Sequence, residues 1–62
     1  MINPEYARKL DVAARVVDDA YVAGGLDAVE TEMASWRRLD ADPVILAEME
    51  RLHRRHCLRV RA

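Results

Sequence analysis

The chain has 62 residues, of which 52% are hydrophobic and 34% charged, and its formal net charge is −1. This length allows one small domain, and a chain this hydrophobic with a net charge near zero is not a disordered one. Its single cysteine and two histidines exclude an internal disulfide framework and a standard four-ligand zinc module built from one chain.

No apolar stretch approaches the ~20 residues that a membrane-spanning helix requires, and the N-terminus lacks the apolar core of a secretory signal. We therefore expect a cytoplasmic protein with no membrane association. Nine arginines against one lysine are typical of a bacterial, plasmid or phage protein from a GC-rich genome.

The first predicted helix covers residues 4–23. Asn3 is suited to cap it, Pro4 takes its first position, and Gly24-Gly25 is suited to end it. Its apolar stripe covers about half the circumference, which is more than one packing neighbour requires. The stripe consists of Tyr6, Leu10, Val12, Ala13, Val16, Val17, Ala20 and Tyr21.

Two further helices are predicted after the glycines. Asp27 and Glu30 resemble a capping box that opens a helix over about residues 28–39. Asp42-Pro43 repeats the cap-then-proline signal and opens a helix over about residues 43–60. The apolar strip of the second helix is Val29, Met33 and Trp36, and that of the third is Ile45, Met49, Leu52, His56 and Val60.

These elements predict an all-α protein with one domain over residues 1–62, a three-helix hairpin or small bundle. Linkers of two to four residues make consecutive helices near neighbours that run roughly antiparallel. A single core of this size rarely contributes more than about 3–5 kcal/mol of stability. The thin core and the wide first stripe together favour a homodimer with two-fold symmetry.

Charge is distributed unevenly along the chain. Residues 1–50 carry five basic and eleven acidic side chains, whereas residues 51–62 carry five arginines and no acid. The arginines of the last helix form a basic ridge that is able to contact phosphates. Alternatively the ridge is solvated, with Glu48 and Glu50 pairing with Arg51 and Arg54 along the helix.

His53, His56 and Cys57 are the candidate metal ligands. Their spacing places pairs of them on adjacent turns, but a complete zinc site needs a symmetry mate or an acid such as Glu50. The alternative is a packed interface in which Cys57 is a small apolar side chain. We expect no metal and no cofactor.

No catalytic residues are predicted. Ser35 is the only serine and no positioned base accompanies it, and Gly24-Gly25 lacks the other residues of a phosphate-binding loop. A chain this short also lacks the pocket volume that enzymes use. We expect a protein that is not an enzyme.

The sequence therefore predicts a small regulatory protein that binds a larger protein partner and modulates or inhibits it. The residues expected to contact that partner are Trp36, Arg37, Arg51, Arg54, Arg55 and Arg59. The alternative is a dimeric nucleic-acid-binding regulator that uses the arginine-rich C-terminal helix. Steep salt dependence distinguishes phosphate contacts from a mainly apolar protein interface.

Overall fold

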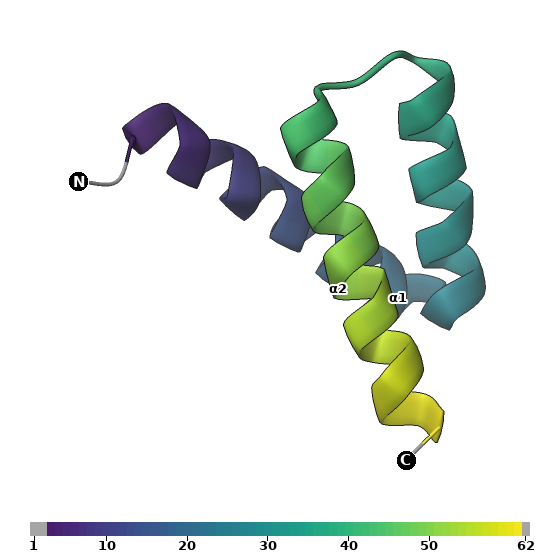
Figure 1. The fold of residues 1–62 in the computed structure, drawn as a ribbon. Coiled ribbons are helices and arrows are strands. Elements are labelled where there is room, and N and C mark those ends of the chain that lie inside the picture. Colours follow the sequence, from purple (N-terminus) through teal and green to yellow (C-terminus); the bar gives the residue numbers. More distant parts are fainter. Residues whose placement is uncertain (1–2, 62) are drawn as a thin grey trace.

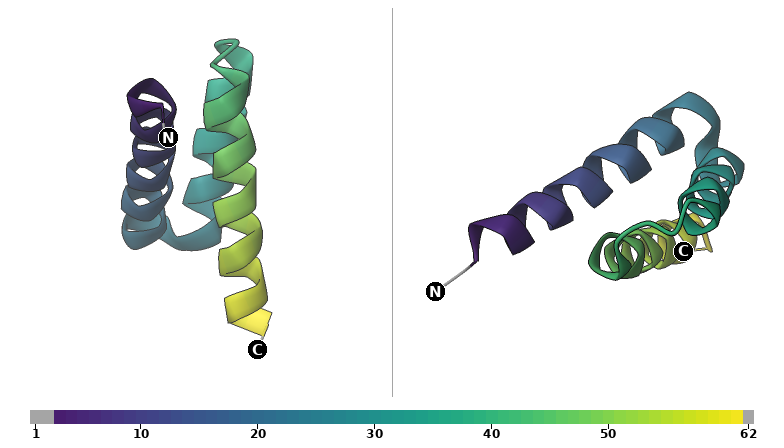
Figure 2. Two further views of the ribbon diagram at one scale, coloured as in Figure 1. Left: turned by 60° about the vertical axis from the view of Figure 1, so that its left-hand side comes forward. Right: turned by 90° about the horizontal axis from the view of Figure 1, so that it is seen from above.

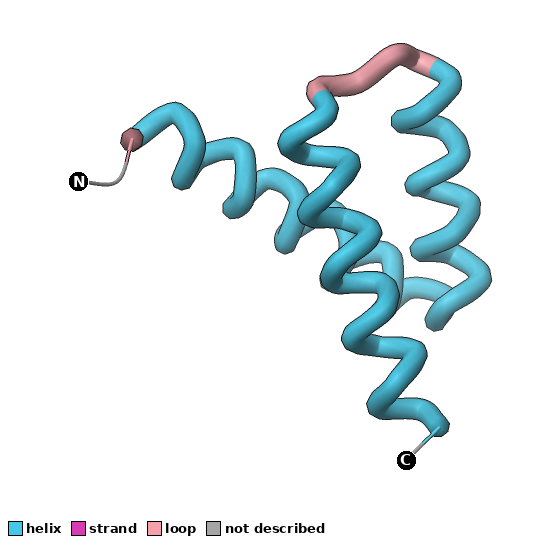
Figure 3. Tube along the Cα trace, viewed as in Figure 1, coloured by secondary structure: helices cyan, strands magenta, loops and turns pink. Residues whose placement is uncertain are grey.

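The computed structural model describes the backbone of residues 3–61 and the side chains of residues 3–59. Within this range the chain forms two helices, α1 (Pro4–Arg38) and α2 (Pro43–Arg61), which pack against each other as a hairpin (Figure 1). A loop over residues 39–42 joins them (Figure 3). The predicted all-α fold is confirmed. The side chains of Val60 and Arg61, which the sequence places on the last helix, lie outside the described part.

Helix α1 is sharply bent at Gly25. This residue has φ 72° and ψ −156°, a backbone conformation that is essentially restricted to glycine because it has no Cβ. One residue is enough for the bend, and helical structure continues on both sides without a linker. The prediction of three separate helices is therefore wrong. The predicted helices 4–23 and 28–39 are two parts of α1, which we call the N-terminal arm (residues 4–24) and the C-terminal arm (residues 26–38).

The N-terminal arm runs in the same direction as α2 (Figure 2). Near the beginning of both segments, Lys9 Nζ lies 2.7 Å from Asp42 Oδ2. Near their ends, the ring of Tyr21 stacks on that of His56 with the centroids 4.3 Å apart. These two contacts follow each other in the same order along both segments, so the arm and α2 run in the same general direction while crossing at an angle (Figure 1).

The C-terminal arm runs antiparallel to α2. Glu30, early in the arm, lies 3.6 Å from His53 Nε2, and Arg37, near its end, lies 2.7 Å from Glu50. The order of these contacts is reversed along α2. The bend at Gly25 thus gives α2 a neighbour from each arm.

Two of the predicted helix caps are confirmed. Asn3 Oδ1 accepts a hydrogen bond from the Glu5 amide at 2.9 Å. Asp42 Oδ1 accepts one from the Val44 amide at 2.8 Å. Asp27 lies inside α1, where its carbonyl oxygen accepts from the Thr31 hydroxyl at 3.0 Å. The predicted cap at Asp27 is wrong because α1 has no new N-terminus at that position.

Five side chains in the described part of the chain are buried and form the core. Each belongs to an apolar face that the sequence predicts, and both arms and α2 contribute. They are Ala13, Val17, Val29, Met33 and Met49.

The width of the first apolar stripe is explained within a single chain. Val16 and Ala20, which widen the stripe, pack against the same core from the N-terminal arm. Both arms and α2 contribute side chains to that core, so the stripe faces more than one packing neighbour. Tyr6 and Leu10 of the same stripe are not among the described side chains that pack against this core. Among the described residues, neither helix has an apolar stretch long enough to cross a membrane.

Candidate binding surfaces on the second helix

Two of the six expected contact residues are held in ion pairs within the chain. Arg51 donates two hydrogen bonds to Glu48, at 2.7 and 2.8 Å, in the bidentate geometry that suits a guanidinium and a carboxylate. The bonds from Arg51 lower the pKa of Glu48, and those to Glu48 raise the pKa of Arg51. Arg37 donates to Glu50 at 2.7 Å and so connects the C-terminal arm with α2. Both guanidinium charges are largely neutralised.

The other three arginines on α2 form a separate surface. Arg54, Arg55 and Arg59 are exposed, and no ion pair involves them among the described side chains. Leu58 stands among them with 65% of its surface exposed, because residues three and four apart are neighbours on a helix. We call Arg54, Arg55, Leu58 and Arg59 the arginine surface.

Trp36 is partly buried and packs against the core from the C-terminal arm. Its indole Nε1 donates a hydrogen bond to Glu32 Oε1 at 3.0 Å. The apolar part of the Trp36 indole thus packs beside the core, while its Nε1 edge reaches the surface. This arrangement leaves Trp36 apart from the arginine surface.

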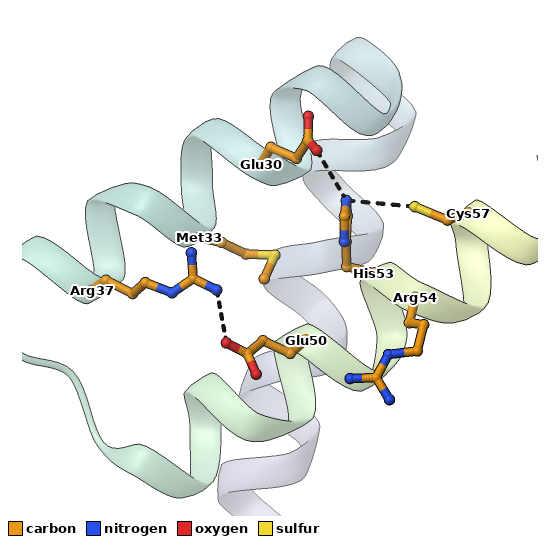
Figure 4. A pocket seen from close by; sticks show the side chains of 7 residues that line it. All are labelled: Glu30, Met33, Arg37, Glu50, His53, Arg54 and Cys57. Atoms are coloured by element: carbon orange, nitrogen blue, oxygen red, sulfur yellow. Dashed lines mark hydrogen bonds and ion pairs between the residues drawn. The ribbon is translucent and has the colours of Figure 1, made fainter.

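An open cleft of about 490 Å³ lies between the C-terminal arm and α2. Two carboxylates and two guanidinium groups line this cleft, and Met33 and Cys57 supply apolar surface (Figure 4). Arg37 and Glu50 are bonded across one end of it. The complete lining is Glu30, Met33, Arg37, Glu50, His53, Arg54 and Cys57.

The structure separates the three candidate metal ligands. His53 lies in the cleft, with its Nε2 3.7 Å from Cys57 Sγ. His56 lies on a different side of α2, against Tyr21, and its Nε2 is 3.9 Å from Asp18 Oδ1. Across residues 3–59 no group of three or more acidic, histidine or cysteine side chains is arranged to hold a metal ion.

A second, apolar depression lies between the N-terminal arm and the beginning of α2. Its volume is about 370 Å³, and the Glu48–Arg51 pair borders it. Its apolar lining, which we call the apolar groove, consists of Tyr6, Leu10, Pro43, Val44 and Ala47.

Sequence reasoning missed this groove. It assigned Tyr6 and Leu10 to the stripe that faces the core, yet Tyr6 is 49% exposed. The available signal was on the last helix, where Val44 and Ala47 fall outside the predicted apolar face. Small apolar residues on the outer side of a helix indicate a further contact.

The chain matches no protein family, no curated protein and no solved structure. Its function is therefore argued from its own surfaces.

Proposed function

We propose that this chain is a small regulatory protein that acts by binding a larger protein and modulating or inhibiting it. The observation that carries the proposal is the arginine surface. There, three exposed guanidinium groups without acidic partners in the described chain surround the exposed Leu58. Its partner surface is acidic at the edges and apolar at the centre.

The exposed leucine favours a protein partner over nucleic acid. A phosphate backbone offers nothing to the side chain of Leu58, whereas the centre of a protein interface buries apolar groups inside a polar rim. Carboxylates also lie close to this surface, because Arg54 shares the cleft with Glu30 and Glu50. These acids repel phosphates that approach Arg54 from the cleft.

The six expected contact residues contribute differently to this proposal. Arg37 and Arg51 already donate to Glu50 and Glu48, so each has fewer free N–H groups for a partner than an unpaired arginine. Trp36 lies apart from the arginine surface and packs against the core, so it contributes less than the sequence predicts. Specific binding therefore depends mainly on Arg54, Arg55 and Arg59, which α2 holds in fixed relative positions.

Capture of partners by the tagged chain from a bacterial lysate, with and without nuclease, tests the proposal. We expect a stoichiometric protein that remains bound after nuclease treatment. Capture that disappears with nuclease, and falls steeply with salt, assigns the arginine surface to nucleic acid and contradicts the proposal.

Two substitutions of exposed aliphatic residues sharpen the test. Leu58→Gln removes the apolar centre of the arginine surface, and we expect it to weaken capture. Val22→Gln is the matched control, because Val22 is 86% exposed on the N-terminal arm. Equal capture by both variants and the wild type contradicts a role for the apolar centre.

A further inference from the structure

We infer that the apolar groove binds a second copy of this chain, so that two copies form a dimer related by a two-fold axis. The groove lies at the beginning of α2 and the arginine surface near its end, so the two surfaces serve different partners. Three properties of the single chain point to a second copy as the occupant of the groove: its surface area, the charge around the groove, and the size of the core.

The first property is surface area. The accessible surface of the chain is 4760 Å², whereas a compact monomer of this mass exposes about 4,100 Å². This excess of roughly 650 Å², summed over the whole chain, approaches the ~800 Å² that each partner buries in a standard interface. Tyr6, half exposed beside the groove, accounts for part of the exposed apolar surface.

The second property is charge. In an isologous interface the same surface meets itself, so a surface with net charge repels its own copy. Two ion pairs lie at this face, Glu48 with Arg51 in the lining of the groove and Lys9 with Asp42 at the residues next to Leu10 and Pro43 in the sequence. This face is therefore close to neutral and apolar at its centre. The arginine surface carries three unpaired positive charges and cannot face its own copy in this way.

The third property is the small core, which has five buried side chains among those described. Association with a second copy buries the groove and stabilises the folded chain by an amount that rises with the logarithm of the chain's own concentration. A second copy is present wherever the chain is made, unlike any other partner. The groove thus supplies the apolar burial that the single chain lacks.

Sedimentation equilibrium tests the inference. It compares the wild-type chain with two variants in which an exposed alanine is replaced by glutamate. We expect the wild type to have twice the chain mass of 7.1 kDa. Ala47→Glu places a charge in the groove and is expected to raise the dissociation constant of the dimer at least about 100-fold. Ala47 is exposed in the single chain, so the new carboxylate does not disturb the core.

Ala34→Glu is the matched control. It makes the same change at an exposed alanine of the C-terminal arm, and we expect a dimer as stable as that of the wild type. A second groove variant, Tyr6→Asp, places its acid in the first turn of α1, where the helix dipole favours it. We expect this variant to be helical by circular dichroism and monomeric.

Thermal unfolding gives an independent readout. The midpoint of a dimer rises with protein concentration, and we expect this dependence for the wild type and Ala34→Glu but not for Ala47→Glu. A wild type that stays monomeric over a 100-fold range of protein concentration overturns the inference. So does a dimer that Ala47→Glu and Tyr6→Asp leave intact. A third outcome also overturns the inference. If the wild type is a monomer that captures a different protein, and Ala47→Glu loses this capture, the groove binds that protein.

Discussion

Tyr21 and His56 stack with their rings inclined by only 15° and their centroids 4.3 Å apart. This contact fixes the end of the N-terminal arm against α2, far from the loop that joins the two helices. His56 is held by Tyr21 on one side of α2, and Arg54 and Leu58, each two positions away from His56, lie on the opposite side of the helix.

A double-mutant cycle between Tyr21 and His56 measures this contact. We expect Tyr21→Ala and His56→Ala to be coupled by about 0.5–1.5 kcal/mol in the free energy of unfolding, because stacked aromatic pairs contribute about that much beyond their burial. Chemical denaturation of the wild type, the two single variants and the double variant gives this coupling free energy. Tyr6 with His56 is the control pair, whose substitutions should add within about 0.5 kcal/mol. Additivity at Tyr21 and His56 would show that the stacking contributes nothing.

Substitutions at position 25 test the bend in α1. An L-alanine there has open space for its Cβ, but φ 72° is a strained conformation for it, so we expect a loss of about 1–3 kcal/mol. A D-alanine favours positive φ, and chemical synthesis of the 62-residue chain allows its incorporation. We expect the D-alanine chain to be at least as stable as the wild type. Equal destabilisation by both alanines would contradict the bend.

The contrast between local and long-range contacts explains which features the sequence predicts. Asn3 and Asp42 are confirmed as caps because a cap depends on residues two positions away. The Glu48–Arg51 pair also follows from helical spacing. Glu50, by contrast, binds Arg37 of the other helix and not Arg54 at i+4, since antiparallel packing brings Arg37 closer.

The same contrast applies to the candidate surfaces. Spacing along the last helix predicts an exposed basic ridge with Arg59 at its border with the apolar face, but it does not reveal which arginines pair with acids. Nor does it reveal the apolar groove. That groove exists because the bend at Gly25 turns the N-terminal arm into the same general direction as α2, which brings Tyr6 and Leu10 beside Val44. A residue pattern within one helix carries no information on this juxtaposition.

The Lys9–Asp42 ion pair predicts a specific pH dependence of stability. The hydrogen bond from Lys9 holds the pKa of Asp42 below its ordinary value of 3.8, and the bond to Asp42 raises the pKa of Lys9 above 10.5. The contribution of Asp42 is therefore complete above about pH 4 and is lost as the pH falls through its lowered pKa. That of Lys9 is complete below its ordinary pKa and is lost as the pH rises through its raised one.

Lys9→Met tests this dependence by urea unfolding at several pH values. We expect the variant to be less stable than the wild type at neutral pH, and the difference to shrink as the pH falls through the lowered pKa of Asp42 and this carboxylate becomes protonated. Arg15→Met is the control, because Arg15 and Asp11 are exposed and 3.8 Å apart, and such pairs contribute little. A difference at Lys9 that stays constant down to pH 2 would rule out the ion pair as its cause.

The most direct test of the account is the affinity of the chain for its captured protein after removal of charge from the arginine surface. The first variant combines Arg54→Gln, Arg55→Gln and Arg59→Gln. The control combines Arg8→Gln, Arg15→Gln and Arg38→Gln, three exposed arginines on α1. Both variants lose the same charge, so any difference between them reports the location of the contact. The account predicts that titration calorimetry shows at least about tenfold weaker binding for the first variant and nearly unchanged binding for the second. Equal affinities of the two variants would contradict it.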